Sequence, residues 1–439
     1  MRVLVWGLGY VGTVTAACAA ELGHEVIGIE PNPAKVDAIR NGKSAVREPG
    51  LDEAVGRAVA GGRLTVEPAG TDLVRDADLS LVCVGTPSNP DGGPLTDHLQ
   101  QVSLDIGEGL RRSERYHVVA IRSTVFPGTC RNLVARVLEE RSGRRRGEDF
   151  GLVSNPEFLR ETTAIQDFHE APYTVIGQLD SRSGDAAVSL YAGLSAPVLR
   201  VSLEEAELLK LANNAFHAMK IGFANEIGRI GERAGVDAGV VMNMVCADTK
   251  LNISPAYLRP GFAFGGSCLP KDLRSLVFHG RRLGVELPIL EGVLRSNQEQ
   301  IAAVRVRIHA LGVRRIAILG LGFKPGTDDL RESPVIALIR DLWQDGIDVT
   351  VHDPDIRPDT MMGSNREFLE RQLPQVRQIL RGRIEDALET CEAVVVTQSR
   401  PEFTAAVGIL PRRIPVLDLV RAAPAPAAEL AVGAPAGER

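Results

Sequence analysis

The chain carries one glycine-rich turn twice, and this repeat constrains its fold more than any other feature. Residues 3–6 form an apolar run that leads into GLGYVG at 7–12, and residues 316–319 form another that leads into GLGFKP at 320–325. A buried strand that enters a glycine turn and then a helix is typical of the βαβ unit that opens a Rossmann-type sheet. The repeat therefore predicts two such units within a chain of 439 residues, a length that suits several domains.

Both copies continue with the alternation that a parallel sheet requires. After the first turn, residues 13–22 have the composition of a helix that ends at Gly23, and residues 25–29 form a second strand that is followed by Glu30. The further apolar runs that we expect to be strands lie at 79–84, 118–121 and 152–154 in the first copy and at 349–353, 393–396 and 416–419 in the second. Strands that alternate with helices predict an α/β fold with two Rossmann-like, doubly wound parallel-sheet domains.

A long helical segment separates the two copies. Ser202 and Glu205 form a capping box, and apolar residues recur at helical spacing from there to Gly235. We expect this helix to connect the domains and to form part of a dimerisation region. The predicted organisation is a first Rossmann domain at 1–201, a central helical domain at 202–300, a second Rossmann-like domain at 301–421 and a disordered tail rich in Ala, Pro and Gly at 422–439.

Charge and cysteine usage narrow the classes of function. The net charge of −6 argues against a general binder of nucleic acid or membrane surfaces, and no apolar stretch approaches the roughly 20 residues that span a bilayer. The chain begins directly in its first apolar run, without the pattern of a signal peptide. Six scattered cysteines indicate neither a disulfide framework nor, with the histidines, a metal site. We therefore expect a cytoplasmic protein without a bound metal.

The first turn has the residues of a dinucleotide site. Gly7 allows the tight turn, Gly9 lets the backbone approach a pyrophosphate, and Gly12 lets helix and strand pack closely. Glu30 follows the next strand, where a carboxylate binds the adenosine ribose and repels a 2′-phosphate. This pattern predicts NAD as the cofactor rather than NADP.

Other strand ends differ in what they indicate. Thr86 and Thr124 each follow a later strand of the first copy, at the edge where ligands bind in parallel sheets. Both are candidate cofactor contacts, although the ordinary polarity of loops would also explain them. In the second copy, Pro325 replaces the third glycine, so we expect that copy not to bind a dinucleotide in the standard way.

One cysteine occupies a position that favours reactivity. Cys268 lies in a glycine-rich loop that runs into a predicted helix, and Pro270 and Asp272 suit the first turn of that helix. The positive end of the helix dipole, together with Lys271, favours the thiolate form of Cys268. The cysteines that lie in apolar segments, where we expect small core residues, are Cys18, Cys83 and Cys391.

The long helix carries a narrow polar stripe. Lys210, Asn214, His217 and Asn225 fall within a sector roughly 80° wide on a helix that is otherwise apolar. We expect this stripe to line a polar pocket inside the protein, and the alternative is a polar seam in a helix dimer.

A third group of polar residues completes a candidate chemistry. Glu157 and Glu161 follow directly on a strand, where one of them can act as a base, although acids are also ordinary at helix starts. Oxidation of an alcohol by a nicotinamide cofactor gives an aldehyde, to which the Cys268 thiolate can add. Loss of a second hydride gives a thioester, and water then releases the acid. Lys210 and Asn214 would stabilise the negative oxygen of each addition step.

The chain resembles the UDP-glucose/GDP-mannose dehydrogenase family from residue 1 to about 421. The motifs that carry the resemblance are GLGYVG (7–12), EPGL (48–51), CVGTP (83–87), NPEFLRE (155–161), FANEIG (223–228), GFAFGGSCLPKD (261–272) and FKPGTDDLRESP (323–334). Within the family, it is most similar to the GDP-mannose 6-dehydrogenases of the alginate type. The resemblance implies NAD-dependent four-electron oxidation of GDP-mannose to GDP-mannuronate for polysaccharide biosynthesis, in a homodimer or higher oligomer built on the central helix.

The resemblance also implies roles for individual residues. Cys268 is the implied nucleophile, and the implied helpers in oxyanion stabilisation and proton transfer are Lys210, Asn214 and Asp272, with Glu157 as the base for thioester hydrolysis and Thr124 nearby. Besides the three glycines of the turn, the implied cofactor contacts are Tyr10, Val11, Glu30, Lys35, Thr86, Thr124, Lys271 and Arg331. The implied substrate contacts are Glu161, Lys210, Asn214, His217, Asn225, Tyr257, Arg259, Phe262, Gly265 and Lys324. In the GDP-mannose branch, the residue that matches Arg259 reaches the substrate of the neighbouring subunit.

Two departures from the family pattern leave alternatives open. Glu30 stands where the family usually has Asp, and Ala256 stands where the GDP-mannose branch has Tyr, which removes one sugar-nucleotide contact. A UDP-glucose or UDP-N-acetyl-hexosamine 6-dehydrogenase would use the same chemistry. A non-catalytic regulator that binds nucleotide sugars is a more distant alternative, because it would not need Cys268, Lys210, Asn214 and Asp272.

Overall fold

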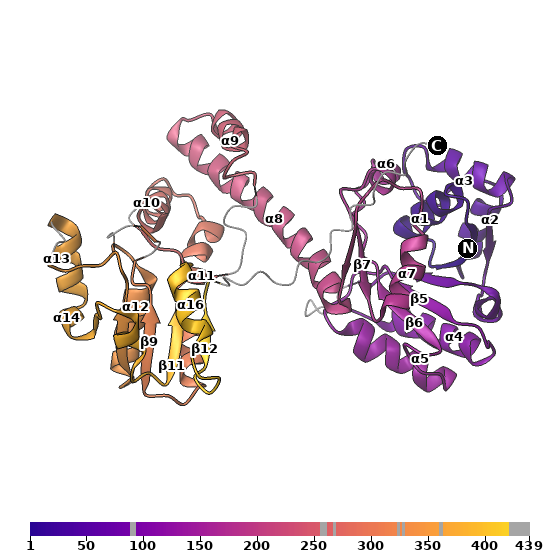
Figure 1. Ribbon diagram of the computed structural model, residues 1–439. Coiled ribbons are helices and arrows are strands. Elements are labelled where there is room, and N and C mark those ends of the chain that lie inside the picture. The colour runs from indigo at the N-terminus through magenta and orange to yellow at the C-terminus, as the bar shows by residue number, and fades with distance from the viewer. Residues whose placement is uncertain are drawn as a thin grey trace, which may run out of the picture. The chain divides into compact units, whose positions relative to one another are not determined.

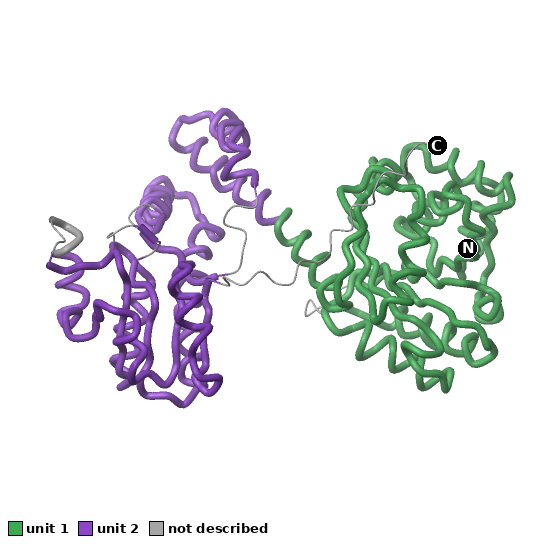
Figure 2. Tube along the Cα trace, viewed as in Figure 1, with its two compact units in different colours: residues 1–217, 426–439 green, residues 218–425 purple. Residues whose placement is uncertain are grey.

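The computed structural model describes residues 1–87, 94–254, 261–266, 269–322, 325–326, 330–359 and 363–420. It divides the chain into two compact units, with the boundary after His217 (Figures 1 and 2). Unit 1 contains residues 1–217, and unit 2 begins at Ala218. The boundary falls within a single long helix, α8 (Leu203–Ala234).

Unit 1 is built on a sheet in the order β3-β2-β1-β4-β5-β6-β7-β8. Its strands are β1 (Arg2–Trp6), β2 (Glu25–Ile29), β3 (Leu64–Glu67), β4 (Leu79–Val82), β5 (His117–Ile121), β6 (Phe150–Ser154), β7 (Thr174–Gln178) and β8 (Val198–Val201). The first six strands are parallel and follow the order of a dinucleotide-binding sheet, as predicted.

The sheet of unit 1 is not parallel throughout, which the sequence did not indicate. β7 pairs antiparallel with β6, with Val153 opposite Gln178, and β8 then runs parallel to β7. An antiparallel neighbour enters the sheet at the edge where the preceding strand leaves it. The connection 155–173, which contains Glu157, therefore stays at the carboxyl edge of the central strands.

Both faces of this sheet are covered by helices. Val3 and Val5 belong to one apolar cluster, and Leu4 and Trp6 belong to the other, because successive side chains of a strand point to opposite faces. The helices that contribute to the first cluster are α1 (Tyr10–Glu21), α2 (Pro33–Arg40), α3 (Leu51–Ala60), α6 (Ala164–His169) and α7 (Ser181–Ser189). Those of the second are the 3₁₀ helix η1 (Thr71–Asp76), α4 (Asp97–Arg111), the π-helix η2 (Cys130–Val134), α5 (Ala135–Ser142) and the start of α8.

Helix α8 begins as the sequence predicts. The Ser202 amide donates to Glu205 Oε2 at 2.8 Å, and the Glu205 amide donates to Ser202 Oγ at 3.3 Å. This reciprocal pair is the capping box. The helix then runs for 32 residues.

Unit 2 continues from the end of α8 into helices and a second sheet. The helices before the sheet are α9 (Ala238–Ala247), α10 (Leu269–Arg282) and α11 (Pro288–His309). The sheet has the order β10-β9-β11-β12, all parallel, with β9 (Arg315–Leu319), β10 (Asp348–His352), β11 (Ala393–Val396) and β12 (Val416–Asp418). The helices within this second α/β fold are α12 (Pro334–Gln344), α13 (Gly363–Gln372), α14 (Val376–Ile379), α15 (Ile384–Leu388) and α16 (Pro401–Gly408).

The predicted repeat is confirmed in atomic detail. The Gly7 amide donates to the Ile29 carbonyl at 2.8 Å, and the Gly320 amide donates to the His352 carbonyl at 2.9 Å. Both glycines have positive φ, 89° and 105°, a backbone region that disfavours other residues. The first turns of the two sheets therefore have the same geometry. Among the described residues, no helix is long and apolar enough to cross a membrane.

A buried carboxylate ties α8 to the sheet of unit 1. Glu207 is 2% exposed and accepts hydrogen bonds from the backbone amides of Gly128 at 2.6 Å and Cys130 at 2.8 Å. These amides belong to the start of η2, where unpaired N–H groups need an acceptor.

We predict that Glu207→Ala lowers the free energy of unfolding by about 2–4 kcal/mol and the Tm by roughly 5–15 °C, because it leaves buried donors without a partner. Glu204→Ala is the matched control, since Glu204 lies on the same helix and makes a surface ion pair with Arg131 at 2.6 Å. The control should cost less than about 1 kcal/mol. Equal losses in thermal denaturation would rule out the capping role.

Candidate active site

The first glycine turn joins β1 to α1 and leaves space for a ligand. A Cβ atom on Gly12 would lie 1.9 Å from the Gly7 carbonyl oxygen, so only glycine allows this contact between turn and helix. A Cβ atom on Gly9 would meet nothing within 4 Å, so the backbone there is open to close approach. This geometry fits a dinucleotide pyrophosphate at the start of α1.

Glu30 is held rigidly beside this turn. It is 6% exposed, and its Oε2 accepts from the Leu8 amide at 3.0 Å, while its Oε1 accepts from the Asn32 amide at 3.1 Å. Lys35 pairs with the same carboxylate at 3.2 Å. The carboxylate is therefore fixed at the end of β2, where a ribose would bind.

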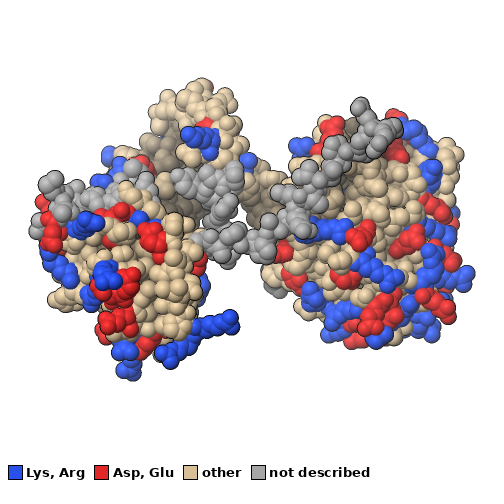
Figure 3. Space-filling model, viewed as in Figure 1, with Lys and Arg blue, Asp and Glu red and all other residues tan. Residues whose placement is uncertain are grey.

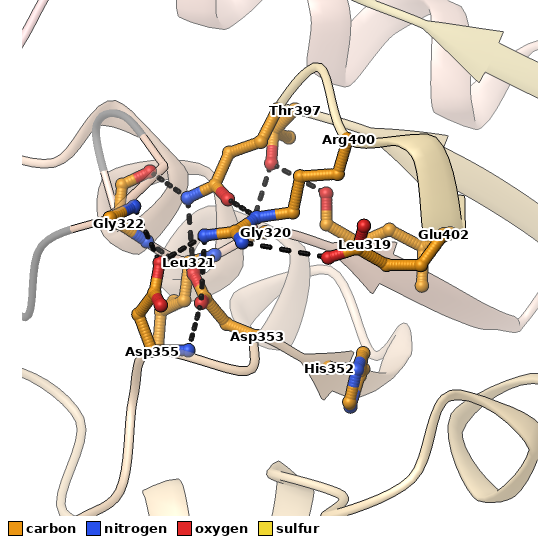
Figure 4. Close-up of polar contacts among 12 residues, drawn as sticks. Leu319, Gly320, Leu321, Gly322, His352, Asp353, Asp355, Thr397, Arg400 and Glu402 are labelled. Atoms are coloured by element: carbon orange, nitrogen blue, oxygen red, sulfur yellow. Dashed lines mark hydrogen bonds and ion pairs between the residues drawn. The ribbon is translucent and has the colours of Figure 1, made fainter. Parts of the chain in front are cut away.

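The second turn has the same plan but a different set of partners (Figure 4). Asp353 takes the place of Glu30, and its Oδ2 accepts from the amides of both Leu321 at 2.7 Å and Gly322 at 2.9 Å. Arg400 reaches across from the start of α16 to pair with Asp355. Asp353 therefore holds two amides of the second turn, and the expectation that this copy does not bind a dinucleotide in the standard way stays a prediction.

The proposed cofactor contacts of unit 1 gather at the carboxyl ends of the strands. Thr86 donates its hydroxyl to the Thr124 carbonyl at 2.7 Å, which joins the ends of β4 and β5. Tyr10, in the first turn of α1, donates its hydroxyl to Glu48 Oε2 at 2.5 Å. Burial and the Glu48 carboxylate both hold the pKa of Tyr10 above its usual value.

Glu157 and Lys210 meet in unit 1. Lys210 Nζ lies 3.0 Å from Glu157 Oε1, and the side chains are only 9% and 12% exposed. Glu157 lines a cavity of about 380 Å³, to which Phe158 and His217 also contribute. A loop from the sheet and the long helix thus bring together two residues that the sequence placed in the same chemistry.

The polar stripe of α8 differs from the sequence-based expectation of an internal pocket. Lys210 is buried, but Asn214, His217 and Asn225 are all exposed in the isolated chain. Apolar neighbours on the helix, such as Met219 and Ile221, are exposed as well. The exposure of polar and apolar residues alike on this part of the helix favours the alternative of a seam in a helix dimer.

In unit 2, a loop that precedes α10 is held against two other segments. The Phe264 amide donates to Asn297 Oδ1 at 2.8 Å, and Asn297 Nδ2 donates to the Phe264 carbonyl at 2.9 Å. A Cβ atom on Gly265 would lie 2.4 Å from the carbonyl oxygen of Glu332, so the loop packs directly on the segment that contains Arg331. Phe262 packs against the apolar core of the second sheet.

The start of α10 carries exposed charges. Lys271 and Asp272 form an ion pair at 2.9 Å, with exposed fractions of 68% and 67%. Glu161 is also exposed. The residues named from the sequence that lie outside the described ones are Ala256, Tyr257, Arg259, Cys268, Lys324 and the tail 422–439.

The sequence reasoning missed several residues that shape these sites. Glu48 accepts from the amides of Thr162 and Ala164, both at 2.8 Å, and so caps α6. Glu226 accepts from the amides of Ile289 at 2.7 Å and Leu290 at 3.1 Å at the start of α11. A single acid inside an otherwise apolar or glycine-rich motif was the available signal for both.

Cys18 and Cys83 are poor nucleophiles. Burial raises the pKa of Cys18 and of Cys83 to about 12. Cys18, Glu21 and His169 each offer a ligand atom, and these atoms lie close enough together to hold a metal ion. Cys246 is exposed.

We predict that iodoacetamide at pH 8 labels Cys18 and Cys83 far more slowly than free cysteine added to the same solution, because a pKa of about 12 leaves a thiolate fraction of only about 10⁻⁴. Raising the pH should increase their labelling tenfold per unit. Peptide mass spectrometry of timed samples measures these rates. Labelling of either thiol as fast as free cysteine would contradict the raised pKa.

Profiles of one protein family match most of the chain. They are described as the UDP-glucose/GDP-mannose dehydrogenase family, NAD binding domain, at residues 1–195, the central domain at 204–299, and the UDP binding domain at 317–420.

Individual relatives match over nearly the full length. A GDP-mannose 6-dehydrogenase of Pseudomonas putida is 43% identical over 96% of each chain, and a UDP-glucose 6-dehydrogenase of Bacillus subtilis is 35% identical over 84% of this chain and 79% of that protein. The crystal structure of a ternary complex of GDP-mannose dehydrogenase from Pseudomonas aeruginosa covers 97% of this chain and 98% of its own, with 41% identity and a TM-score of 0.94. A UDP-glucose dehydrogenase from Pyrobaculum islandicum covers 96% and 95%, with 37% identity and a TM-score of 0.56.

Proposed function

The chain belongs to the UDP-glucose/GDP-mannose dehydrogenase family, and we propose that it is an NAD-dependent GDP-mannose 6-dehydrogenase. The observation that carries the choice of substrate is the higher similarity to GDP-mannose enzymes, 43% identity over 96% of the chain against 35% over 84% for a UDP-glucose enzyme. The proposed reaction converts GDP-mannose, two NAD⁺ and water into GDP-mannuronate, two NADH and three protons.

The chain's own residues divide this work between the two units. NAD accepts hydride when it is bound at the first glycine turn. Glu30 fixes this turn through the Leu8 amide, and the backbone at Gly9, before α1, is open to a ligand. In the proposal, Cys268 forms the thiohemiacetal and the thioester, and Lys210 and Asn214 stabilise the negative oxygen in each addition. Glu157 takes a proton from water as the water oxygen bonds to the thioester carbon, the C–S bond breaks and the thiolate leaves.

The proposed domains follow this division. Residues 1–201 bind NAD, 202–300 form a helical domain with the cysteine loop, and 301–421 bind the nucleotide of the substrate, with 422–439 as a tail. The family's UDP binding domain matches within the third of these segments. The remaining site residues predicted from the sequence, including Tyr257, Arg259 and Lys324, stay proposed substrate contacts. We further propose a cytoplasmic location, where NAD and sugar nucleotides are available.

The proposed function predicts two NADH per GDP-mannose consumed. The measurement is NADH absorbance with purified protein and NAD, with UDP-glucose and UDP-N-acetyl-hexosamines supplied in parallel. Cys268→Ser should yield almost no acid, because an alkoxide leaving group and nucleophile replace a thiolate. Cys391→Ser is the control and should keep wild-type yield, since a serine hydroxyl can keep the hydrogen bond that Cys391 Sγ donates to the Leu388 carbonyl.

Each outcome of that experiment is informative. Two NADH with a UDP sugar alone would overturn the choice of nucleotide and keep the mechanism. One NADH per sugar, or full acid yield from Cys268→Ser, would overturn the role of the cysteine.

We also propose that the protein forms a homodimer through α8 and α9. No residue of α9 is buried in the isolated chain, although the helix is strongly apolar. Figure 3 shows few charged side chains on the visible face of this part of unit 2. The exposed large apolar residues here are Met219, Ile221, Val236, Val240, Met244, Leu251 and Ile253. Exposed apolar patches of this kind mark protein interfaces.

Light scattering after size-exclusion chromatography tests the dimer. The wild type should have about twice the chain mass of 47.2 kDa, and Val240→Asp with Met244→Asp should reduce it to the monomer mass, because two buried charges oppose association. Ile409→Asp is the matched control, as Ile409 is 86% exposed outside this patch. A monomeric wild type would contradict the proposal.

A further inference from the structure

A buried arginine, Arg122, lines the same cavity as Glu157. Arg122 directly follows β5 and is 5% exposed. Its Nη1 donates to Asn155 Oδ1 at 3.1 Å and to the Tyr191 hydroxyl at 2.9 Å. The Tyr191 hydroxyl in turn donates to Asn155 Oδ1 at 2.5 Å. The three side chains form a closed, buried triangle.

The hydrogen bonds of Arg122 all go to neutral groups, which is unusual for a buried charge. Within the described ranges, no carboxylate lies at ion-pair distance from Arg122, and its Nε is buried without a hydrogen-bond partner. A buried charge without a close counter-charge is costly, so stability alone does not account for an arginine at this position. Burial lowers the pKa of Arg122, but Tyr191, Cys83 and the carboxylate of Glu157 raise it by more, so the guanidinium stays charged.

Asn155 connects the Arg122–Tyr191 pair to the loop that contains Glu157. The backbone amide of Asn155 donates to the Ile121 carbonyl of β5 at 2.8 Å, and its side-chain Nδ2 donates to the Val175 carbonyl of β7 at 3.0 Å. Asn155 is therefore fixed on both sides of β6. Pro156 follows with a restricted φ, and Glu157 comes next.

Both carboxylate oxygens of Glu157 have a partner that fixes the side chain. Its Oε2 accepts from the Leu159 amide at 2.6 Å, and its Oε1 pairs with Lys210 at 3.0 Å. Arg122, Glu157 and Tyr191 all border the same cavity. The Glu157 carboxylate thus pairs with the Lys210 ammonium and also interacts electrostatically with the Arg122 guanidinium.

We propose that Arg122 is a positioning residue that, through Asn155 and Tyr191, holds Glu157 against Lys210 in the orientation needed for thioester hydrolysis. This inference rests on the proposed function, because it assigns Arg122 to one step of that reaction. In that step, water adds to the thioester carbon, its proton passes to Glu157, and the thiolate of Cys268 leaves. Hydride transfer precedes this step and does not require Glu157.

The kinetic test separates hydrolysis from hydride transfer. Stopped-flow NADH formation with GDP-mannose and NAD should show, for Arg122→Met, a burst of two NADH per site followed by a steady rate roughly 10- to 100-fold below wild type. KM should fall together with the steady rate, so that kcat/KM changes little, because the slowed step follows the steps that commit the substrate. Arg122→Lys should recover part of the steady rate, since it restores a cation and a donor.

Two further variants keep the test sharp. Tyr191→Phe removes only the hydroxyl that bridges Arg122 and Asn155, so it should show a weaker form of the same defect even if Arg122→Met folds poorly. Arg182→Met is the control, because Arg182 stacks on the Tyr116 ring at 3.5 Å and lies on α7, away from the loop. A purely structural role would lower the burst and the steady rate together and would overturn the proposal.

A second readout does not depend on the reaction. In a crystal structure of Arg122→Met or Tyr191→Phe, the distance between Lys210 Nζ and a Glu157 carboxylate oxygen should exceed 4 Å, against 3.0 Å here. An unchanged pair would overturn the positioning role whatever the activity. Failure of the wild type to make two NADH would instead overturn the proposed function, and the crystal distance would still decide the role of Arg122.

Discussion

The structure depends on one constraint, the burial of parallel strands on both faces. A strand such as β1 has apolar side chains in both directions, so polar chemistry cannot lie on either face of the sheet. It is displaced to the carboxyl ends of the strands, where the backbone changes direction and amides become available. The glycine turn, Glu30, Thr86 and the loop with Glu157 all lie at this edge of unit 1.

The same constraint explains the buried carboxylates. Helices that pack on a sheet begin near this edge with unpaired amides, and carboxylates satisfy them. Glu207 and Glu226 project from α8 to the starts of η2 and α11, and Glu48 reaches the start of α6. Asp353 does the same work at the second glycine turn. Acids in these motifs therefore hold elements together around the site as well as offering chemistry within it.

Much of the fold could be predicted from the sequence, because its signals are local. The glycine turns, the alternating apolar runs and the capping box at Ser202 each specify structure over a few residues. The antiparallel entry of β7 could not be predicted, since it depends on which edge the 155–173 connection occupies. The site could be predicted from the sequence only in part. Helical periodicity grouped Lys210 with Asn214 and His217, but the exposure of these side chains depends on what covers α8. The triangle of Arg122, Asn155 and Tyr191 joins residues far apart in sequence, and no short pattern encodes it.

The central claim is that a thioester on Cys268 is an intermediate that Glu157 resolves. The most direct measurement is mass spectrometry of Glu157→Gln protein quenched during turnover of GDP-mannose with NAD, followed by peptide mapping. The account predicts that the peptide containing Cys268 gains the mass of a GDP-mannuronyl group, because the amide keeps the shape of the side chain but cannot accept a proton from water. An unmodified cysteine together with undiminished acid production would contradict it.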